Sequence, residues 1–400
     1  MKRKILSLLV AASLSQTLMA NESPEEVSLL KQQIKLLTER LDKLEESPKK
    51  IVMTRVKKNS KKQSKTSLSD RISFKVDFRE RYEIIDQEGI EERDRNRLRL
   101  RASMKMQVDD SLSFTLGMAT GGDDPVSTNQ TLDTGSSTKD IRLNLAHFDY
   151  KFNDSLSLTG GKMNNPFYKP GKTPAFWDSD LTPEGFALKF KSGNTKGVLV
   201  GFSLEERKAD SDTYMLGGQI THDFKMSDSS KLIAGVGYYN YTNLQGFGTL
   251  YDSKPRGNSV DANGNYLIDF NIAEFLVEFK TKVGGQPLSF FGNLHKNTAA
   301  DDLDTSIVYG VNYGKVKAPG SWKVGLSFID NEADSVIGLF NDSDFAGGNT
   351  DSKGFLLKYG YGIKKNLSFG LAYISSEFGQ SQTEQTEYNR LQLDLKMKFK

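Results

Sequence analysis

Two segments between residues 71 and 108 alternate apolar residues with cations. The apolar positions are Ile72, Phe74, Val76 and Phe78 in the first segment and Leu98, Leu100, Ala102, Met104, Met106 and Val108 in the second. The cations form what we call the basic ladder: Arg71, Lys75, Arg79, Arg81, Arg93, Arg95, Arg97, Arg99 and Arg101. Side chains of a strand point alternately to its two faces, so each segment is predicted to have one apolar and one basic face.

The basic ladder predicts an unusual environment. A hairpin about Gly89 would place Arg79 opposite Arg99 and Arg81 opposite Arg97. Like charges about 5 Å apart repel by roughly 0.8 kcal/mol in water, and by more where water is sparse. We therefore expect a wet cavity with counter-charges. A water-filled lumen lined with arginine is the simplest such cavity, and it would attract anions. Alternatively, the cations only pack with lumenal carboxylates such as Asp77 and Glu80.

Further segments along the chain alternate in the same way. With the first two they number about sixteen, an even number, as bacterial membrane barrels require. Changes of phase near His147 and between Ile272 and Phe275 predict β-bulges. The segments are Leu112 to Met118, Ile141 to Phe152, Leu156 to Phe167, Phe186 to Phe190, Val198 to Leu204, Thr213 to Phe224, Leu232 to Tyr241, Leu267 to Val283, Leu288 to Leu294, Ile307 to Tyr313, Trp322 to Phe328, Phe355 to Ile363, Leu367 to Tyr373 and Leu391 to Phe399.

The connections alternate in length. Short ones are Asp109-Asp110, Asn153-Asp154, Ser192 to Thr195, Gly284 to Pro287 and Lys364 to Asn366. Long ones are Gly121 to Asp140, Tyr168 to Thr182, Gln245 to Asn265, Asp330 to Asp351 and Gly379 to Glu387. Short turns at one rim and long loops at the other are typical of an outer-membrane barrel with its short turns in the periplasm. A soluble sandwich or propeller has no reason to segregate loop lengths in this way.

The first 69 residues have a different character. Residues 1–20 predict a secretory signal peptide, with an uncleaved membrane anchor as the alternative. Residues 21–48 predict a periplasmic coiled-coil helix, whose heptad seam is Val27, Leu30, Ile34, Leu37, Leu41 and Leu44. This helix either makes a homotrimer or rests alone on its own barrel. Residues 49–69 form a Lys-rich linker, either solvated or in contact with lipid head groups or the cell wall, and residues 70–400 form the barrel.

Composition narrows the class of protein. The mean hydropathy is -0.51 and 37% of residues are hydrophobic. No internal run reaches the roughly 20 apolar residues of a membrane helix, but barrel strands give a weak hydropathy signal. The net charge of +3 provides no global basic field, so nucleic acid is not expected as a partner. Cysteine is absent, which excludes disulfides and thiolate metal sites.

The segment from Arg142 to Leu188 carries a family resemblance. GGKMNNPF at Gly160 to Phe167 and FWDSDLTPEGFAL at Phe176 to Leu188 resemble the signature region of the bacterial putative porin family, as does FRERYE at Phe78 to Glu83. The resemblance covers about the last 330 residues and implies a sixteen-stranded outer-membrane barrel for passive diffusion, without naming a solute. The chain departs from such barrels at its end, where Lys400 follows the aromatic Phe399.

The resemblance also points to a constriction. Tyr168 to Thr182 is the third loop on the long-loop side, counting the hairpin at Gly89 as the first, and in sixteen-stranded porins the third loop folds into the lumen. Its acids Asp178 and Asp180, with Glu184 just beyond, would then face the basic ladder across the channel. Opposed charges on opposite walls would favour small hydrated solutes. Alternatively, these acids pair with arginines and hold the loop down.

No enzymatic site is predicted. His147, His222 and His295 lie on separate predicted strands with no nucleophile motif beside them. The acidic clusters Asp123-Asp124 and Asp301-Asp302-Asp304 lack the ligand spacing of a calcium loop, so solvated loop charge is preferred to a cation site. We predict no cofactor and no metal.

The sequence therefore predicts an all-β transmembrane barrel of about 16 antiparallel strands, preceded by a short coiled-coil helix, in the outer membrane of a Gram-negative cell. The predicted function is a water-filled porin for small hydrophilic solutes, with a preference for anions. One alternative is a specific uptake channel for a chelate or an organic acid. Another is a structural anchor that links the outer membrane to the cell wall.

Overall fold

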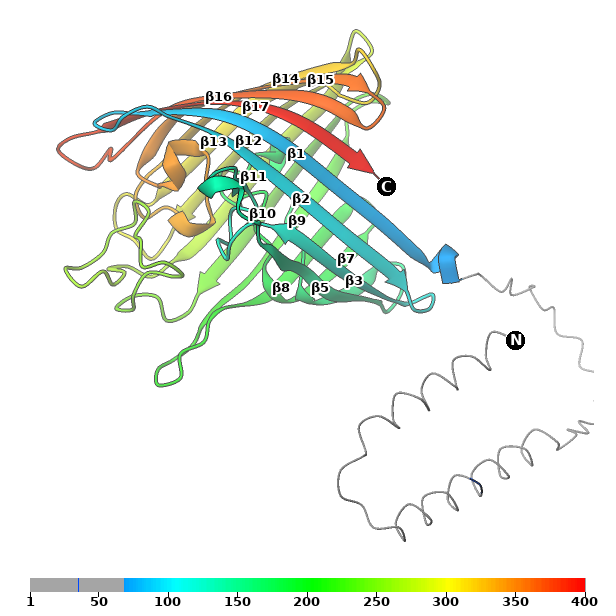
Figure 1. The fold of residues 1–400 in the computed structure, drawn as a ribbon. Helices are drawn as coiled ribbons and strands as arrows, with labels where there is room; N and C mark the ends of the chain where they lie inside the picture. Colours follow the sequence, from blue (N-terminus) through cyan, green and yellow to red (C-terminus); the bar gives the residue numbers. More distant parts are fainter. Residues whose placement is uncertain (1–34, 36–67, 400) are drawn as a thin grey trace, which may run out of the picture. The chain divides into compact units, whose positions relative to one another are not determined.

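The computed structural model describes Lys35 and residues 68–399 (Figure 1). The predicted signal peptide, the coiled-coil seam and nearly all of the Lys-rich linker lie outside the described residues, so they stay predictions. In the part of the chain that is described, no helix is long and apolar enough to cross a membrane.

Residues 72–399 form one closed, antiparallel barrel, in which β1 pairs with both β2 and β17 (Figure 1). It has sixteen long strands, and the two-residue β4 adds a short pairing to β2. The expected barrel of about sixteen strands is confirmed. The strands are β1 (Ile72–Gln87), β2 (Arg93–Gln107), β3 (Leu112–Thr120), β4 (Gln130–Thr131), β5 (Ile141–Lys151), β6 (Leu156–Lys162), β7 (Glu184–Ser192), β8 (Thr195–Glu205), β9 (Thr213–Lys225), β10 (Lys231–Tyr241), β11 (Asn271–Val283), β12 (Gln286–Asn297), β13 (Thr305–Gly314), β14 (Trp322–Asn331), β15 (Ser352–Lys364), β16 (Leu367–Phe378) and β17 (Thr386–Phe399).

The two faces of the strands have the polarity of a membrane barrel. On β9, Leu216 is 53% exposed, whereas Thr213 is fully buried and Gln219 is 6% exposed. Leu199 on β8 and Phe275 on β11 likewise lie on the outer face, more than half exposed. A soluble sheet would bury these apolar side chains, so an apolar outer surface with polar residues inside indicates contact with lipid.

The connections alternate around the barrel as expected. Seven short turns join the strands at one rim, which we call the short-turn rim, and β1 begins and β17 ends there. At the long-loop rim, three connections matter for the interior: loop 3 (163–183), loop 5 (242–270) and loop 7 (332–351). Loop 3 is the third connection at this rim, as predicted. Short 3-10 helices interrupt the chain: η1 (Leu68–Arg71), η2 (Thr134–Ser136), η3 (Pro170–Lys172), η4 (Gly338–Phe340) and η5 (Phe345–Gly348).

One predicted bulge is confirmed and the other is wrong. The register between β3 and β5 shifts so that Asn144 has no partner, close to His147. The pairing of β10 with β11 runs without a shift from Asn271 to Lys280. Ile272 and Leu276 simply face the interior, where both are fully buried. The sequence pattern changes phase because the interior is apolar at this point.

The apolar interior is made by the loops. Loops 3, 5 and 7 fold inward and pack on the inner faces of β7 to β11, in a cluster that includes Phe167, Phe176, Trp177, Tyr239, Phe270 and Phe340. The ring of Phe176 stacks on His295 of β12 with centroids 3.8 Å apart. Burial of several aromatic side chains, each removing about 150–250 Å² from water, fixes these loops inside the barrel. Much of this side of the lumen is filled, although cavities of about 490 and 350 Å³ remain there, bordered by residues of β6 to β9 and of β8 to β10.

Candidate functional site

The register of the first hairpin brings the basic ladder together as expected. Arg79 pairs with Arg99 and Arg81 with Arg97 across β1 and β2. On the other side of β1, Arg79 pairs with Lys396 and Arg81 with Asp394 of β17. Three adjacent strands therefore present a charged wall to the interior.

Carboxylates of the same wall neutralise part of this charge. Glu83 of β1 is fully buried and forms ion pairs with Arg95, Arg97 and Arg390. Arg390 Nη2 lies 2.6 Å from Glu83 Oε2. Asp394 accepts hydrogen bonds from Arg81 Nε and Nη2 at 2.7 and 3.1 Å. A carboxylate that accepts two parallel bonds from one guanidinium holds it firmly in place.

Asp77 of β1 continues this pattern toward the short-turn rim. Its Oδ1 lies 2.6 Å from Arg99 Nη2, and its Oδ2 lies 3.4 Å from Lys398 Nζ. Like charges on neighbouring strands are therefore interleaved with acids, which offsets their repulsion.

Two inward loops supply further counter-charges. Asp180 of loop 3 forms ion pairs with Arg101 and with Arg99, the latter at 3.6 Å. Asp344 of loop 7 lies 3.0 Å from Arg81 Nη1 and 2.8 Å from Arg390 Nη2. Although burial opposes ionisation, Arg101 and Arg99 lower the pKa of Asp180 to about 2. The pKa of Asp344 is likewise well below its usual value, because Arg390 and Arg81 outweigh the effect of burial.

Asp178 and Glu184 do not meet the ladder. Asp178 joins loops 3 and 7: its backbone N–H donates to Phe340 O at 2.8 Å, and its Oδ2 accepts from Ser343 N at 3.0 Å. Burial, Asp180 and Asp342 raise its pKa well above the usual value. Glu184 begins β7 and pairs with Lys162 Nζ at 2.7 Å. Of the three predicted acids, only Asp180 forms an ion pair with the ladder.

The middle of the ladder is less wet than the sequence suggested. Arg79, Arg81 and Arg99 are 8%, 4% and 9% exposed, because loops 3 and 7 cover them. At the short-turn rim, Arg71 donates to backbone oxygens of Gln107 and Val108, and at the other rim Arg93 is exposed. The sequence had placed these guanidinium groups in open solvent, but the structure largely replaces that solvent with carboxylates.

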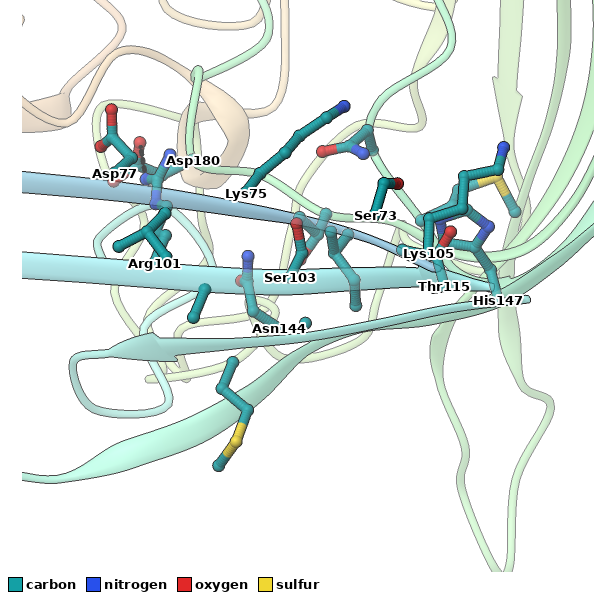
Figure 2. Close-up of a pocket in the computed structure, with 18 of the residues that line it drawn as sticks. Ser73, Lys75, Asp77, Arg101, Ser103, Lys105, Thr115, Asn144, His147 and Asp180 are labelled. Carbon is teal, nitrogen blue, oxygen red and sulfur yellow. Dashed lines mark ion pairs between the residues drawn. The ribbon is translucent and has the colours of Figure 1, made fainter. Parts of the chain in front are cut away.

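Water has access to three cavities along the charged wall. The short-turn cavity, of about 500 Å³, is bordered by Lys75, Arg101, Lys105 and His147 (Figure 2). The outer cavity, of about 480 Å³, lies toward the long-loop rim. Both cavities border Asn144, Asp180 and Thr182, so they meet where Asp180 is bound to Arg101, an ion pair drawn in Figure 2.

The sign of the charge changes at this meeting point. The short-turn cavity has five cations and three carboxylates in its lining, a formal excess of two positive charges: Lys75, Arg101, Lys105, Lys189 and Lys398 against Asp77, Asp149 and Asp180. The outer cavity has two cations and four carboxylates, a formal excess of two negative charges: Arg142 and Lys162 against Asp123, Asp124, Asp180 and Glu184. Clefts with low-dielectric walls focus such fields.

The third cavity, which we call the lysine cavity, has a volume of about 490 Å³ and is the most positive. Seven cations face three carboxylates there, a formal excess of four positive charges: Arg79, Arg81, Arg99, Lys323, Lys358, Lys396 and Lys398 against Asp342, Asp344 and Asp394. Its floor between these cations consists of small residues of β15 and β16, Gly360, Ser368 and Gly370 among them. Small side chains leave the lumen open beside this wall.

Sequence reasoning anticipated Asp77 and Asp180 as partners of the ladder but missed those on β17 and loop 7. Polar and charged residues alternate with leucines from Arg390 to Lys396, and this pattern could have identified β17 as the third charged strand. Asp344 carried no such signal, because it lies in a loop and is separated from Arg81 by 263 positions. Lys323 is the one lysine of β14, and the lysines of β15 are spaced too widely to form a recognisable motif around Lys358.

The histidines lie apart from one another and serve as wall residues. His295 Nε2 is 3.3 Å from Glu274 Oε1, His222 contacts Thr195, and His147 Nδ1 is 3.8 Å from Asp149. Within residues 68–399, no group of three or more His, Asp or Glu residues is positioned to hold a metal ion. The described site is therefore one of charge and shape.

Comparisons with known proteins agree with this architecture. Pseudomonas putida OprB, in a high-pH structure, is 14% identical with a TM-score of 0.57, over 84% of this chain and 96% of that chain. Salmonella typhi OmpF, in complex with daunomycin, is 12% identical with a TM-score of 0.50, over 82% of this chain and 97% of that chain. At these identities the likeness concerns the fold, and no curated protein sequence matches. A family model described as "Putative porin" matches residues 57–267 and 292–399, more than half of the sequence, and the chain therefore belongs to the putative porin family.

Proposed function

We propose that this outer-membrane channel passes small hydrophilic solutes by passive diffusion and that it favours anions. Family and fold together indicate a channel without enzymatic activity. The observation that carries the anion preference is the formal excess of positive charge in the short-turn cavity and in the lysine cavity. Charged pore linings raise the local concentration of ions of opposite sign.

The route follows the charged wall. Loops 3, 5 and 7 pack apolar side chains against β7 to β11, where a hydrated ion would lose its water, and leave cavities of only about 490 and 350 Å³ on that side. The other side borders β1, β2, β3 and β5, whose inward residues include Ser103, Thr115 and Asn144 (Figure 2). Solutes that keep part of their hydration would therefore move between Asp180 and the wall formed by β3 and β5.

The surroundings of the barrel are part of the proposal. The short-turn rim would face the periplasm, since the short turns of such barrels do so. The heptad seam of residues 27–44 would join three copies, and a link from this segment to the cell wall is the accompanying possibility. These points rest on the sequence pattern alone, because the segment lies outside the described residues.

A reversal-potential measurement tests the preference for anions. The full chain is inserted into a planar bilayer between solutions of unequal KCl concentration. We expect a reversal potential displaced toward the chloride equilibrium value, and a smaller displacement in the double variant Lys75→Gln/Lys105→Gln, because both ammonium groups border the short-turn cavity.

The matched control for this measurement is Lys353→Gln. Lys353 pairs with Asp330 at 3.1 Å, and both residues alternate with the inward-facing Ser352 and Asn331, so they lie on the outer face of the barrel. This variant removes one lysine charge, half the change in the double variant, without changing the lumen. A preference for potassium in the unmodified channel would refute the proposal.

A further inference from the structure

The lysine cavity holds cations that no carboxylate of the described residues pairs with. Lys323 of β14 and Lys358 of β15 face this cavity, are exposed to solvent, and form no ion pair or hydrogen bond within residues 68–399. Arg79 borders the same cavity and is only 8% exposed. It donates a hydrogen bond to Asn129, while its Nε has no partner in the described part and no carboxylate is paired with it.

The backbone places these lysines in one region. Lys323 pairs in register with Gly360, and Lys358 lies two residues before Gly360 on the same face of β15. A Cβ at Gly360 would lie 3.1 Å from Lys323 Cε, so the lysine stem occupies the room that the glycine leaves. Lys172 of loop 3 and Lys398 of β17 are close enough to repel Lys323 electrostatically. Four ammonium groups thus converge from three strands and one loop.

Asp342 of loop 7 borders the same cavity as Lys358 but forms no ion pair with it among the described residues. Burial and the charge of Asp344 raise the pKa of Asp342. Asp394 and Asp344 are already engaged by Arg81 and Arg390. Lys323 and Lys358 therefore have no paired carboxylate within residues 68–399.

We propose that the lysine cavity binds small oxyanions that carry two negative charges, such as the dianions of sulfate and phosphate. A buried cation such as Arg79 is costly without a counter-charge, and a bound anion supplies one. The attraction to each ammonium doubles when the anion carries two charges instead of one. Lysine donates as a compact point charge, which suits a tetrahedral oxyanion without requiring a planar, forked geometry.

This inference rests on the proposed function, because an anion must first enter the lumen. The inference also goes beyond the proposed function. Passage of an anion requires only a positive field, whereas binding of an anion requires a fixed group of cations without partners. Binding would slow a dianion enough to obstruct the passage of chloride. The channel would then admit monovalent anions freely and hold divalent oxyanions.

The experiment is a block of chloride current in a planar bilayer at about 0.1 M KCl and pH 8. Sulfate, phosphate and nitrate are added separately to either side of the full-length channel. We expect sulfate and phosphate to reduce the chloride current at concentrations far below that of chloride, and nitrate to have no such effect. The double variant Lys323→Gln/Lys358→Gln should raise the half-blocking sulfate concentration by at least about tenfold, given the Coulomb attraction lost and its screening by salt.

The control variant is Lys353→Gln, which removes a lysine from the outer face of the same strand and should leave the block unchanged. Block by phosphate but not by sulfate would show that the site requires a protonated oxyanion. That result would overturn the proposal that the site selects anions by their charge alone. A chloride-selective channel with no block, or with equal block in the double variant and the unmodified protein, overturns this site and leaves the proposed function standing. A cation-selective channel overturns both.

Discussion

Replacing Asp180 with asparagine removes one carboxylate from the place where the short-turn cavity and the outer cavity meet, and it keeps the size of the side chain. In the structure this carboxylate is paired with Arg99 and Arg101 and also accepts hydrogen bonds from Thr128 N and Oγ1 at 3.2 and 3.0 Å. An asparagine oxygen can keep the bonds from Thr128 but not the ion pairs. The change therefore leaves Arg101 without an ion pair among the described residues and leaves Arg99 paired with Asp77 alone.

The size of the effect follows from Coulomb's law. One unit charge about 5 Å from a passing ion contributes about 0.8 kcal/mol in water, and screening at 0.1 M salt reduces this to about 0.5 kcal/mol. Losing the negative charge of Asp180 should raise the local anion concentration about twofold and lower that of cations by a similar factor. The ratio of anion to cation permeability should then increase about fivefold, and more if the effective dielectric constant is below that of water.

The assay is the reversal potential of single channels in a KCl gradient, with conductance recorded from the same traces. Asp330→Asn is the matched control, because Asp330 lies on the outer face of the barrel and pairs there with Lys353. Loss of the ion pairs also loosens loop 3, so larger or noisier conductance should accompany the shift. An unchanged or reduced anion preference in Asp180→Asn, with the control unaffected, would show that solutes do not pass beside this carboxylate.

Three other predictions test the ion pairs and the unpaired cation of the charged wall. Asp344→Asn leaves Arg81 and Arg390 each short of one partner in a buried setting, so thermal unfolding should report a loss of about 3 kcal/mol and conductance should rise as loop 7 is released. The pKa of Asp180 falls from 3.8 to about 2 on folding, so its contribution of about 2 kcal/mol to stability is complete above about pH 4 and is lost as the pH falls through 2. Extra conductance caused by opening of loop 3 should therefore begin only below about pH 4. In Asp180→Asn, the conductance should not depend on pH in this range. Arg79→Met removes a buried cation without a paired carboxylate and should raise the melting temperature in sulfate-free buffer by an amount equivalent to about 1–3 kcal/mol, whereas equal or lower stability would show that Arg79 is already compensated.

The barrel could be predicted from the sequence because its strands obey a local rule. Lipid on one side and a polar lumen on the other require alternation at every second residue, and this pattern is visible within a few positions. The opposition of Arg79 and Arg99 followed from the hairpin alone, since register is fixed once the turn at Gly89 is known. The rule failed at Ile272, where the lumen side is apolar because loops 3, 5 and 7 cover it.

The site itself was predictable only in part, because its contacts are distant in sequence. Asp180 was anticipated from the inward loop, but Asp178, two residues away, turns toward loop 7 and binds its backbone instead. Loop 7 has no periodic pattern, and nothing local indicates that Asp344 reaches Arg81 and Arg390. Pairing between a wall and a folded-in loop depends on tertiary packing, which short-range patterns do not encode.

The division of the lumen supports the proposed role of the charged wall in selecting solutes. The cluster formed by loops 3, 5 and 7 replaces water on one side of the interior with close-packed apolar side chains. Water therefore screens the charges of the lysines and arginines mainly from the open side. These charges act more strongly on an ion than the same charges would on a free surface. Ion pairs with Asp180, Asp344 and Asp394 cancel the field at the middle of the ladder, whereas Lys323 and Lys358 remain uncompensated within the described residues. We therefore expect selection among anions to occur at the lysine cavity and not at the paired arginines next to it.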